Sequence, residues 1–411
     1  MSTPEHQSPT RWYAVGLVLL VGVVAAFQIG KVPAALPSIR VDLGLDMVGA
    51  GWVASLYTGT AVVLGLAGGV LADRIGHRTT LVMGLALLAA GSLGGSLAQS
   101  GAPIMVSRVV EGAGFVLIVV SAPTLIFRAT APHRHSFVMG VWGTFMPIGL
   151  TFMLLLAPVL MAAVGWRGLW QVNMAIAAAV AVFVLFSLRN GGRRAGPAVV
   201  PPPGRFWADL RETVARPGPW LMSLVFGVFG AQFSIFMTWL PTNLIDMHEI
   251  SIPAAASLTA LVAFVNVPGN LAAGWLMGRG VDRWLLLLVG AMSMGGFGVI
   301  TYWPDLPLAA NLSAAILFSM IGGLVPAAIL ASALFHAPSM SQVGTVNGIL
   351  IHGANVGTLL GAPGFAAVVS YTGGWSGGAL LFLAMGSASA ILALIVGGLE
   401  RRLARAAAPT E

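Results

Sequence analysis

Three charged residues lie inside long apolar stretches, where a charge requires a charged partner, a polar cavity or a bound solute. Lys31, the only lysine in the chain, follows Arg11 by about twenty residues, which is roughly 30 Å along a helix. Gln28 precedes Lys31 by three residues and shares its helix face. Arg108 and Glu111 are also three residues apart and can neutralise each other. These residues predict a polar site for solute binding or proton transfer. The alternatives are a lysine that snorkels to the membrane interface and an Arg108–Glu111 pair with a structural role.

Polar side chains in the second half of the chain form another group of candidates for contact with a solute, and all are uncharged amides or histidine. They are Gln232, Asn266, Asn270, His352 and Asn355. Asn266 and Asn270 are four residues apart, so they share a helix face. His352 has the chemistry to relay a proton or to bind a solute. The alternative for His352 is an ordinary hydrogen bond across a helix interface.

A glycine-rich charged segment follows the second apolar stretch and reads GGVLADRIGHR from 68 to 78. Its glycines permit close helix approach and a tight turn, and its aspartate and arginines can form a charge network that holds one conformation closed. The corresponding segment of the second half, GWLMGRGVDR from 274 to 283, keeps two arginines but has Gly278 in place of an aspartate. We expect a gating role for Gly69, Asp73, Arg74, Gly76, Arg78, Arg279 and Arg283.

The composition requires that membrane-spanning helices carry these residues. The chain is 57% hydrophobic and 8% charged, with a mean hydropathy of +0.91, which is incompatible with the surface of a soluble domain. Apolar stretches of about twenty residues without period-two alternation predict helices rather than strands. We predict an all-α polytopic membrane protein with twelve transmembrane helices in two pseudo-symmetric six-helix bundles. The predicted spans are 12–36, 48–72, 79–98, 103–127, 137–163, 168–188, 219–241, 253–277, 284–303, 308–335, 345–370 and 376–399. The predicted domains are a bundle at 1–188, a cytoplasmic linker at 189–218 and a bundle at 219–411.

The arginines favour one orientation in the membrane. With the N-terminus inside, sixteen arginines flank the cytoplasmic ends of the spans, whereas Arg40 and Arg167 lie outside. We therefore expect both termini in the cytoplasm, and this bias explains the basic pI without a nucleic-acid partner. The chain has no cysteine, which excludes disulfides and thiolate metal sites. No predicted span pairs two histidines with a carboxylate, or a nucleophile with a base, so we expect no metal, no cofactor and no enzymatic activity.

The segment at 68–78 resembles the signature between helices 2 and 3 of the major facilitator superfamily. The residues that match in register are Gly69, Leu71, Asp73, Arg74, Gly76 and Arg78. His77 stands where the signature has a basic residue, so one site becomes titratable. The six-plus-six division and the related second segment extend the resemblance to essentially the whole chain. The resemblance implies a transporter whose two bundles rock around a central site, with helices 1 and 4 as neighbours, so that Glu111 lies between Lys31 and Arg108.

Two cations and one carboxylate then predict a site for an anionic solute. We expect a bacterial inner-membrane secondary transporter that works as a monomer and moves a small anionic organic solute by alternating access. Glu111 is the expected proton-coupling group. Burial and neighbouring cations act on its pKa in opposite directions, and the sequence leaves the sign open. The alternative is a proton-driven exporter of amphipathic or drug-like compounds.

The fifth apolar stretch bears on the direction of transport. Antiporters of this superfamily often carry G-x-x-x-G-P-x-x-G-G there, whereas Met146 precedes Pro147 and Leu150 follows Gly149 in this chain. The broken pattern favours uptake or facilitated diffusion over export. Short features such as GKVP at 30–33 and GWR at 165–167 resemble the bacterial permease branch that includes cyanate and nitroimidazole-type transporters.

Overall fold

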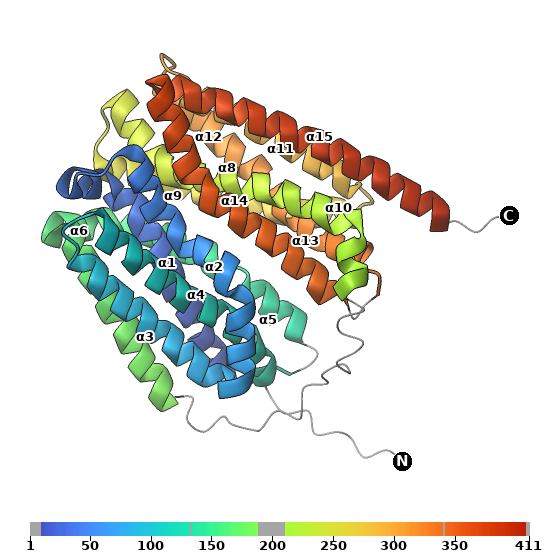
Figure 1. Ribbon diagram of the computed structural model, residues 1–411, viewed down its shortest axis with the longest axis horizontal. Coiled ribbons are helices and arrows are strands. Elements are labelled where there is room, and N and C mark those ends of the chain that lie inside the picture. Colours follow the sequence, from blue (N-terminus) through green and yellow to red (C-terminus); the bar gives the residue numbers. More distant parts are fainter. Residues whose placement is uncertain (1–9, 132–133, 188–209, 340–341, 408–411) are drawn as a thin grey trace. The chain divides into compact units, whose positions relative to one another are not determined.

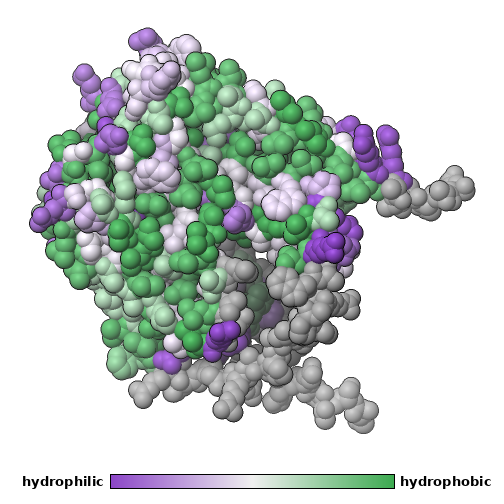
Figure 2. All heavy atoms as spheres, viewed as in Figure 1, coloured by the Kyte–Doolittle hydropathy of each residue, from purple (hydrophilic) through white to green (hydrophobic). Residues whose placement is uncertain are grey.

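The computed structural model describes residues 10–131, 134–187, 210–339 and 342–407. These residues form helices joined by short turns and contain no strand (Figure 1), which confirms the predicted all-α polytopic fold class. The chain divides into two compact units, Met1–Arg193 and Arg194–Glu411. Most of the predicted linker, from 189 to 209, lies outside the described residues. On the face shown in Figure 2, apolar side chains cover most of the length of the helices, as a lipid environment requires.

The first unit contains the helices α1 to α6 of Figure 1. Their bounds are α1 Trp12–Leu43, α2 Met47–Ile75, α3 His77–Ser96, α4 Gly101–Ala129, α5 His135–Trp142 and α6 Phe145–Ser187. Gly44 ends α1 in the left-handed conformation at φ 62°, and Gly76 makes the turn between α2 and α3 at φ 91°. Both positions are readily occupied by glycine because it has no Cβ.

Helix α6 is long enough for two membrane crossings. It runs for 43 residues, about 65 Å at the usual rise, which is twice the thickness of a bilayer core. Its helical geometry is interrupted at Gly165, where φ is 69° and ψ is 178°. The predicted spans 137–163 and 168–188 meet at this break. Within the described residues, eleven helical segments are long and apolar enough to cross a membrane, and α6 is one of them.

The second unit contains the helices α8 to α15. Their bounds are α8 Pro217–His248, α9 Ile252–Phe264, α10 Asn266–Gly278, α11 Arg283–Tyr302, α12 Leu308–Gly322, α13 Leu324–His336, α14 Val343–Thr372 and α15 Trp375–Ala407. Two predicted spans are each divided into two helices. The span at 253–277 is interrupted at Val265, and the span at 308–335 is interrupted at Gly323. Such interruptions are tolerated in membranes where neighbouring helices satisfy the freed backbone groups.

Helices α8 and α14 pack with almost no side-chain material between them. A Cβ added to Gly357 would overlap the carbonyl oxygen of Gly227, and one added to Gly353 would overlap that of Ser223. A Cβ on Gly361 would lie 2.7 Å from the carbonyl oxygen of Ala231. The contacts advance by four residues on both helices, so α8 and α14 run in the same direction. This arrangement of small residues is typical of tightly packed membrane helices.

Candidate functional site

The ammonium of Lys31 lies in a closed polar network inside the first unit. Its Nζ donates hydrogen bonds to Gln28 Oε1 at 2.5 Å and to Ser92 Oγ at 3.0 Å. It also forms an ion pair with Glu111, with 2.6 Å between Nζ and Oε1. The Ser92 hydroxyl donates to the same carboxylate oxygen at 2.6 Å. All four side chains are fully buried, so α1, α3 and α4 together remove the charges from contact with solvent or lipid.

The guanidinium of Arg108 takes the second oxygen of the same carboxylate. Its Nη1 pairs with Glu111 Oε2, and its Nε donates to the carbonyl oxygen of Val53 at 3.0 Å. The Tyr57 ring covers the guanidinium, with 4.7 Å between Cζ and the ring centroid. Arg108 Nη2 is buried without a hydrogen-bond partner. The Glu111 carboxylate therefore holds one cation on each oxygen, and one donor of the network is left free.

The second segment of α6 completes the network through residues that the sequence reasoning did not identify. Asn173 Oδ1 accepts a hydrogen bond of 3.5 Å from Gln28 Nε2, and Asn173 Nδ2 donates to Leu169 O at 2.9 Å. The Lys31 ammonium lies 4.4 Å from the centroid of the Trp170 ring, which adds a cation–π contact. Asn173 could have been identified from the sequence, because it is an amide inside the predicted span 168–188, and Asn266 was selected as an amide inside a predicted span. Ser92 and Trp170 had no comparable signal.

This arrangement can hold or transfer a proton, but it presents no open anion site. With its groups ionised, the network carries two positive charges and one negative charge. A buried ion pair of this kind requires good geometry and further hydrogen bonds to offset desolvation, and the network provides both. The contact between Lys31 Nζ and Glu111 Oε1 is also a direct path for a proton between the two groups, and a change in either group alters the charge felt by Arg108.

The second unit has aromatic residues at the corresponding positions. Lys31 is the twentieth residue of α1, and the twentieth residue of α8 is Phe236. Glu111 is the eleventh residue of α4, and the eleventh residue of α12 is Phe318. Phe236 and Phe318 stack with ring centroids 3.9 Å apart. The same place in a related bundle is thus filled by an apolar pair, which indicates that helix packing does not need the charges.

Of the candidates of the second unit, only Asn266 and Asn270 are joined by a hydrogen bond within the described residues. Gln232 is fully buried, and neither its Nε2 nor its Oε1 has a hydrogen-bond partner. Asn270 Nδ2 donates to Asn266 Oδ1 at 2.8 Å, and Asn266 Nδ2 donates to Ser319 O at 2.8 Å. His352 is exposed and Asn355 is half-buried. Within the described residues no hydrogen bond links Gln232, the Asn266–Asn270 pair and the two residues of α14 to one another. Their assignment to a solute site remains a prediction.

Two arginines of the expected gates, Arg78 and Arg283, contact the last helix of their own unit. Arg78 Nη2 donates to Leu185 O at 2.5 Å near the end of α6, and Arg283 Nε donates to Glu400 Oε1 at 3.1 Å on α15. The Arg279 guanidinium lies 3.7 Å from the Trp275 ring centroid. Gly69 is half-buried, Arg74 is exposed, and the side chain of Asp73 lies outside the described part of the chain. These contacts fix ends of helices within each unit, and the gating role stays a prediction.

Long apolar helices that enclose a charge network define a polytopic membrane transport protein. The chain belongs to the Major Facilitator Superfamily, whose family model matches residues 18–350. Its family and the relatives named below are transporters and not enzymes. Two solved structures share its fold. A bacterial homolog of the human lysosomal transporter Spinster, inward-facing and unoccupied, superposes with a TM-score of 0.79 at 16% identity and covers 97% of both chains. The POT family transporter PepTSo gives a TM-score of 0.78 at 13% identity, covering 96% of this chain and 99% of its own.

Several relatives are export or resistance proteins. The cephamycin export protein CmcT of Amycolatopsis lactamdurans is 30% identical over 69% of this chain and 57% of its own length. The methylenomycin A resistance protein of Streptomyces coelicolor is 25% identical over 92% of this chain and 89% of its own. The gallate transporter of Pseudomonas putida is 24% identical over 88% of this chain and 91% of its own length. This chain spans little more than half the length of the cephamycin export protein. The cyanate and nitroimidazole branch stays a prediction.

Proposed function

We propose that this chain is a proton-coupled secondary transporter of an amphipathic compound. In this proposal the Lys31–Glu111–Arg108 network couples the proton and does not bind the solute. The observation that carries the proposal is that Glu111 engages both cations, one on each carboxylate oxygen, while all three side chains are fully buried. Each cation is already paired with the carboxylate, which weakens its attraction for an anion from solution. This departs from the anionic solute that the sequence led us to expect and favours the alternative.

The coupling step follows from the charges in the network. A proton that reaches Glu111 removes the negative charge that holds Lys31 and Arg108 together, and the two cations then repel each other in a medium of low dielectric constant. Lys31 is on α1 and the other two residues are on α4. Protonation therefore favours movement of α1 against α4, and loss of the proton restores the closed pairing. A change of this kind supplies the link between proton uptake and alternating access.

The relatives support the amphipathic solute and the outward direction. One relative is named for cephamycin export and another for methylenomycin A resistance, and the second of these aligns along nearly its full length. We propose the bacterial cytoplasmic membrane as the location, with both termini inside and a monomer as the working unit. The arginine distribution supports this orientation.

One observation favours a second candidate, which is an anionic aromatic solute. Arg108 Nη2 is a buried donor without a partner, and the ionised network carries a net positive charge. A solute carboxylate could take this donor if the network opened. The gallate transporter, which aligns along most of its length, is consistent with such a solute.

Transport by reconstituted protein separates the two candidates. Proteoliposomes with an imposed pH gradient would be offered neutral and cationic amphipathic compounds alongside aromatic carboxylates. We expect gradient-dependent movement of an amphipathic compound, with proton movement in the opposite direction reported by an internal pH dye. In the variant Lys31→Ala, exchange of this compound without a gradient should persist while the gradient no longer drives accumulation. Saturable transport of a carboxylate that disappears in Lys31→Ala would overturn the proposal in favour of the second candidate.

A further inference from the structure

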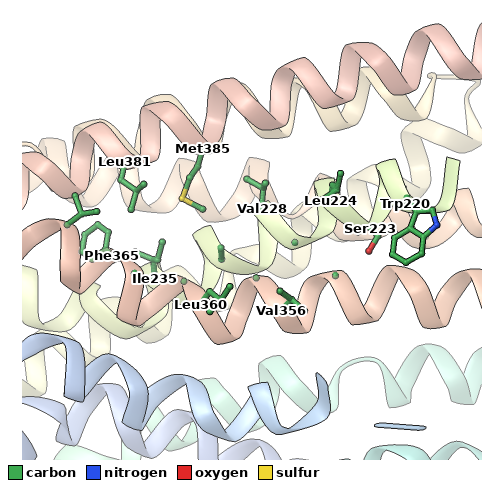
Figure 3. Close-up of a pocket in the computed structure, with 17 residues that line it drawn as sticks. Trp220, Ser223, Leu224, Val228, Ile235, Val356, Leu360, Phe365, Leu381 and Met385 are labelled. Atoms are coloured by element: carbon green, nitrogen blue, oxygen red, sulfur yellow. The ribbon is translucent and has the colours of Figure 1, made fainter. Parts of the chain in front are cut away.

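An apolar groove runs along the second unit between α8, α14 and α15, whereas the charge network belongs to the first unit. The groove has a volume of about 550 Å³. The small residues where α8 and α14 meet form its floor, and large apolar side chains form its walls (Figure 3). Wall residues include Trp220, Leu224, Val228, Leu360 and Met385. Leu224 is 56% exposed and Leu360 is 55% exposed, so the groove is open along its length.

The lining is predominantly apolar, and its polar side-chain groups are already hydrogen-bonded. The only hydroxyl in it belongs to Ser223, which already donates a hydrogen bond of 2.8 Å to Ile349 O. The Trp220 Nε1 donates to Val214 O at 2.9 Å. An occupant must therefore be apolar along the groove. A solute recognised by polar groups would leave its own groups unsatisfied there.

The dimensions suit a linear chain. On α8 the lining extends from Trp220 to Ile235, which is about 22 Å along the helix axis. One leaflet of a bilayer core is roughly 15 Å thick, so a chain anchored at one membrane surface can lie in the groove along its full length. Figure 3 shows Leu381 and Met385 of α15 over the half near Ile235, whereas the Trp220 end is bordered by α8 and α14. The groove therefore opens most widely at the Trp220 end.

The open end of the groove is basic. Arg211 and Arg216 are exposed just before Trp220, and the Trp220–Val214 hydrogen bond holds their segment against the start of α8. The end of α15 belongs to the same region, because Glu400 contacts His336 and His336 packs against Gly218. Beyond Glu400 follow three arginines, which are Arg401, Arg402 and Arg405. Glu212 is paired with Arg216, and Glu400 is paired with Arg283, so positive charge is in excess.

We propose that this groove binds one acyl chain of an anionic membrane phospholipid, with its headgroup against the arginines at the Trp220 end. The apolar lining and its length select the chain, and the basic end selects the sign of the headgroup charge. The tryptophan at the junction has the position that aromatic residues favour at a membrane interface. The site is independent of the transported solute.

Two glycines of α14 provide a matched pair of variants. A Cβ on either Gly364 or Gly348 would meet no atom within 4 Å, but only Gly364 lines the groove. Gly364→Leu therefore places a side chain in the groove from a Cβ position that is free of contacts, and Gly348→Leu adds the same side chain to the same helix elsewhere. Met385→Trp fills the groove from α15. The protein would be placed in nanodiscs with phosphatidylglycerol that carries a photoreactive group on one acyl chain, and the labelled peptides mapped by mass spectrometry.

We expect labelling of α8 and α14 peptides that falls several-fold in Gly364→Leu and Met385→Trp but not in Gly348→Leu. Phosphatidylcholine with the same photoreactive chain should label less, and the double variant Arg211→Gln, Arg216→Gln should abolish that difference. Thermal unfolding shows that each variant is folded. Unchanged labelling in both groove-filling variants, or equal labelling by the two lipids, would overturn the proposal. Displacement of the probe by an amphipathic transport solute, or its exclusion by a second copy of the chain, would assign the groove to that occupant instead.

Discussion

Removing the charge of Glu111 tests whether the network serves coupling or folding. The variant Glu111→Gln leaves Lys31 and Arg108 buried without a counterion, and breaking a buried pair in this way costs about 3–5 kcal/mol. The triple variant Lys31→Met, Arg108→Met, Glu111→Met removes all three charges together. Replacement of a buried ionic cluster by apolar side chains is often neutral or stabilising by about 1–4 kcal/mol. The stacked Phe236 and Phe318 show that a bundle of this fold accepts apolar residues at these places.

The two variants are therefore expected to differ strongly in thermal stability. One kcal/mol corresponds to roughly 2–4 °C in the melting temperature of a unit of about 150–250 residues, so Glu111→Gln should lower it by roughly 6–20 °C. The triple variant should melt within a few degrees of the parent or above it. The assay is thermal unfolding in detergent followed by tryptophan fluorescence. Glu249→Gln, which removes a carboxylate at the end of α8 outside the network, is the control and should have little effect.

Transport by the triple variant completes the test. It should fold and still exchange solute down a concentration gradient, but a pH gradient should not drive accumulation. If the triple variant unfolds as readily as Glu111→Gln, the charges are needed for the fold and the comparison with the second unit is misleading. If it accumulates solute as the parent does, the network is not the coupling element.

Three further outcomes are expected. Gly357→Ala should destabilise the protein by about 1–3 kcal/mol because its Cβ overlaps the Gly227 carbonyl. The control Gly348→Ala should not destabilise it, and equal melting temperatures of the two variants would refute the close packing of α8 and α14. Gly165→Ala should cost roughly 1–3 kcal/mol through backbone strain alone, measured by the same melt, because φ is 69° and no atom lies within 4 Å of the new Cβ. A hydrogen bond from Gln342, together with Arg216, lowers the pKa of Glu212, so this contact stabilises the 210–216 segment at neutral pH and is lost as the pH falls through that lowered pKa. The hydrogen-exchange rate of this segment, corrected for intrinsic rates, should rise at acid pH in the parent protein. In Glu212→Gln the corrected rate should not change over the same pH range.

The membrane spans could be predicted from the sequence. A helix in lipid must satisfy its own backbone hydrogen bonds, and it needs about twenty apolar residues to cross the bilayer core. The break at Gly165 also followed from the predicted spans 137–163 and 168–188. The interruptions at Val265 and Gly323 were missed, since both lie within continuous apolar stretches. Freed backbone groups at such points are satisfied by neighbouring helices, which a single stretch of sequence does not reveal.

The candidate site was predictable in part. Charges inside apolar stretches identified Lys31, Arg108 and Glu111 as residues that need partners. Spacing indicated the Arg108–Glu111 pair, and the family resemblance placed Glu111 beside Lys31 as well; the structure has both ion pairs. The contributions of Ser92 and Asn173 did not follow from spacing, because Lys31 is 61 residues from Ser92 and Gln28 is 145 residues from Asn173. The expectation of an anion site rested on the net positive charge of two cations and one carboxylate. The structure pairs both with one carboxylate.

The sequence by itself determined that this protein is a helical membrane protein, where its spans lie and which buried charges must be neutralised, because these follow from the local cost of placing polar groups in lipid. Only the tertiary structure decided which polar groups complete the network around these charges and close it from solvent. That choice depends on the rotation of each helix about its own axis and on the faces that meet in the bundle. The same geometry brings α8, α14 and α15 together around an apolar groove, which no stretch of the sequence encodes alone.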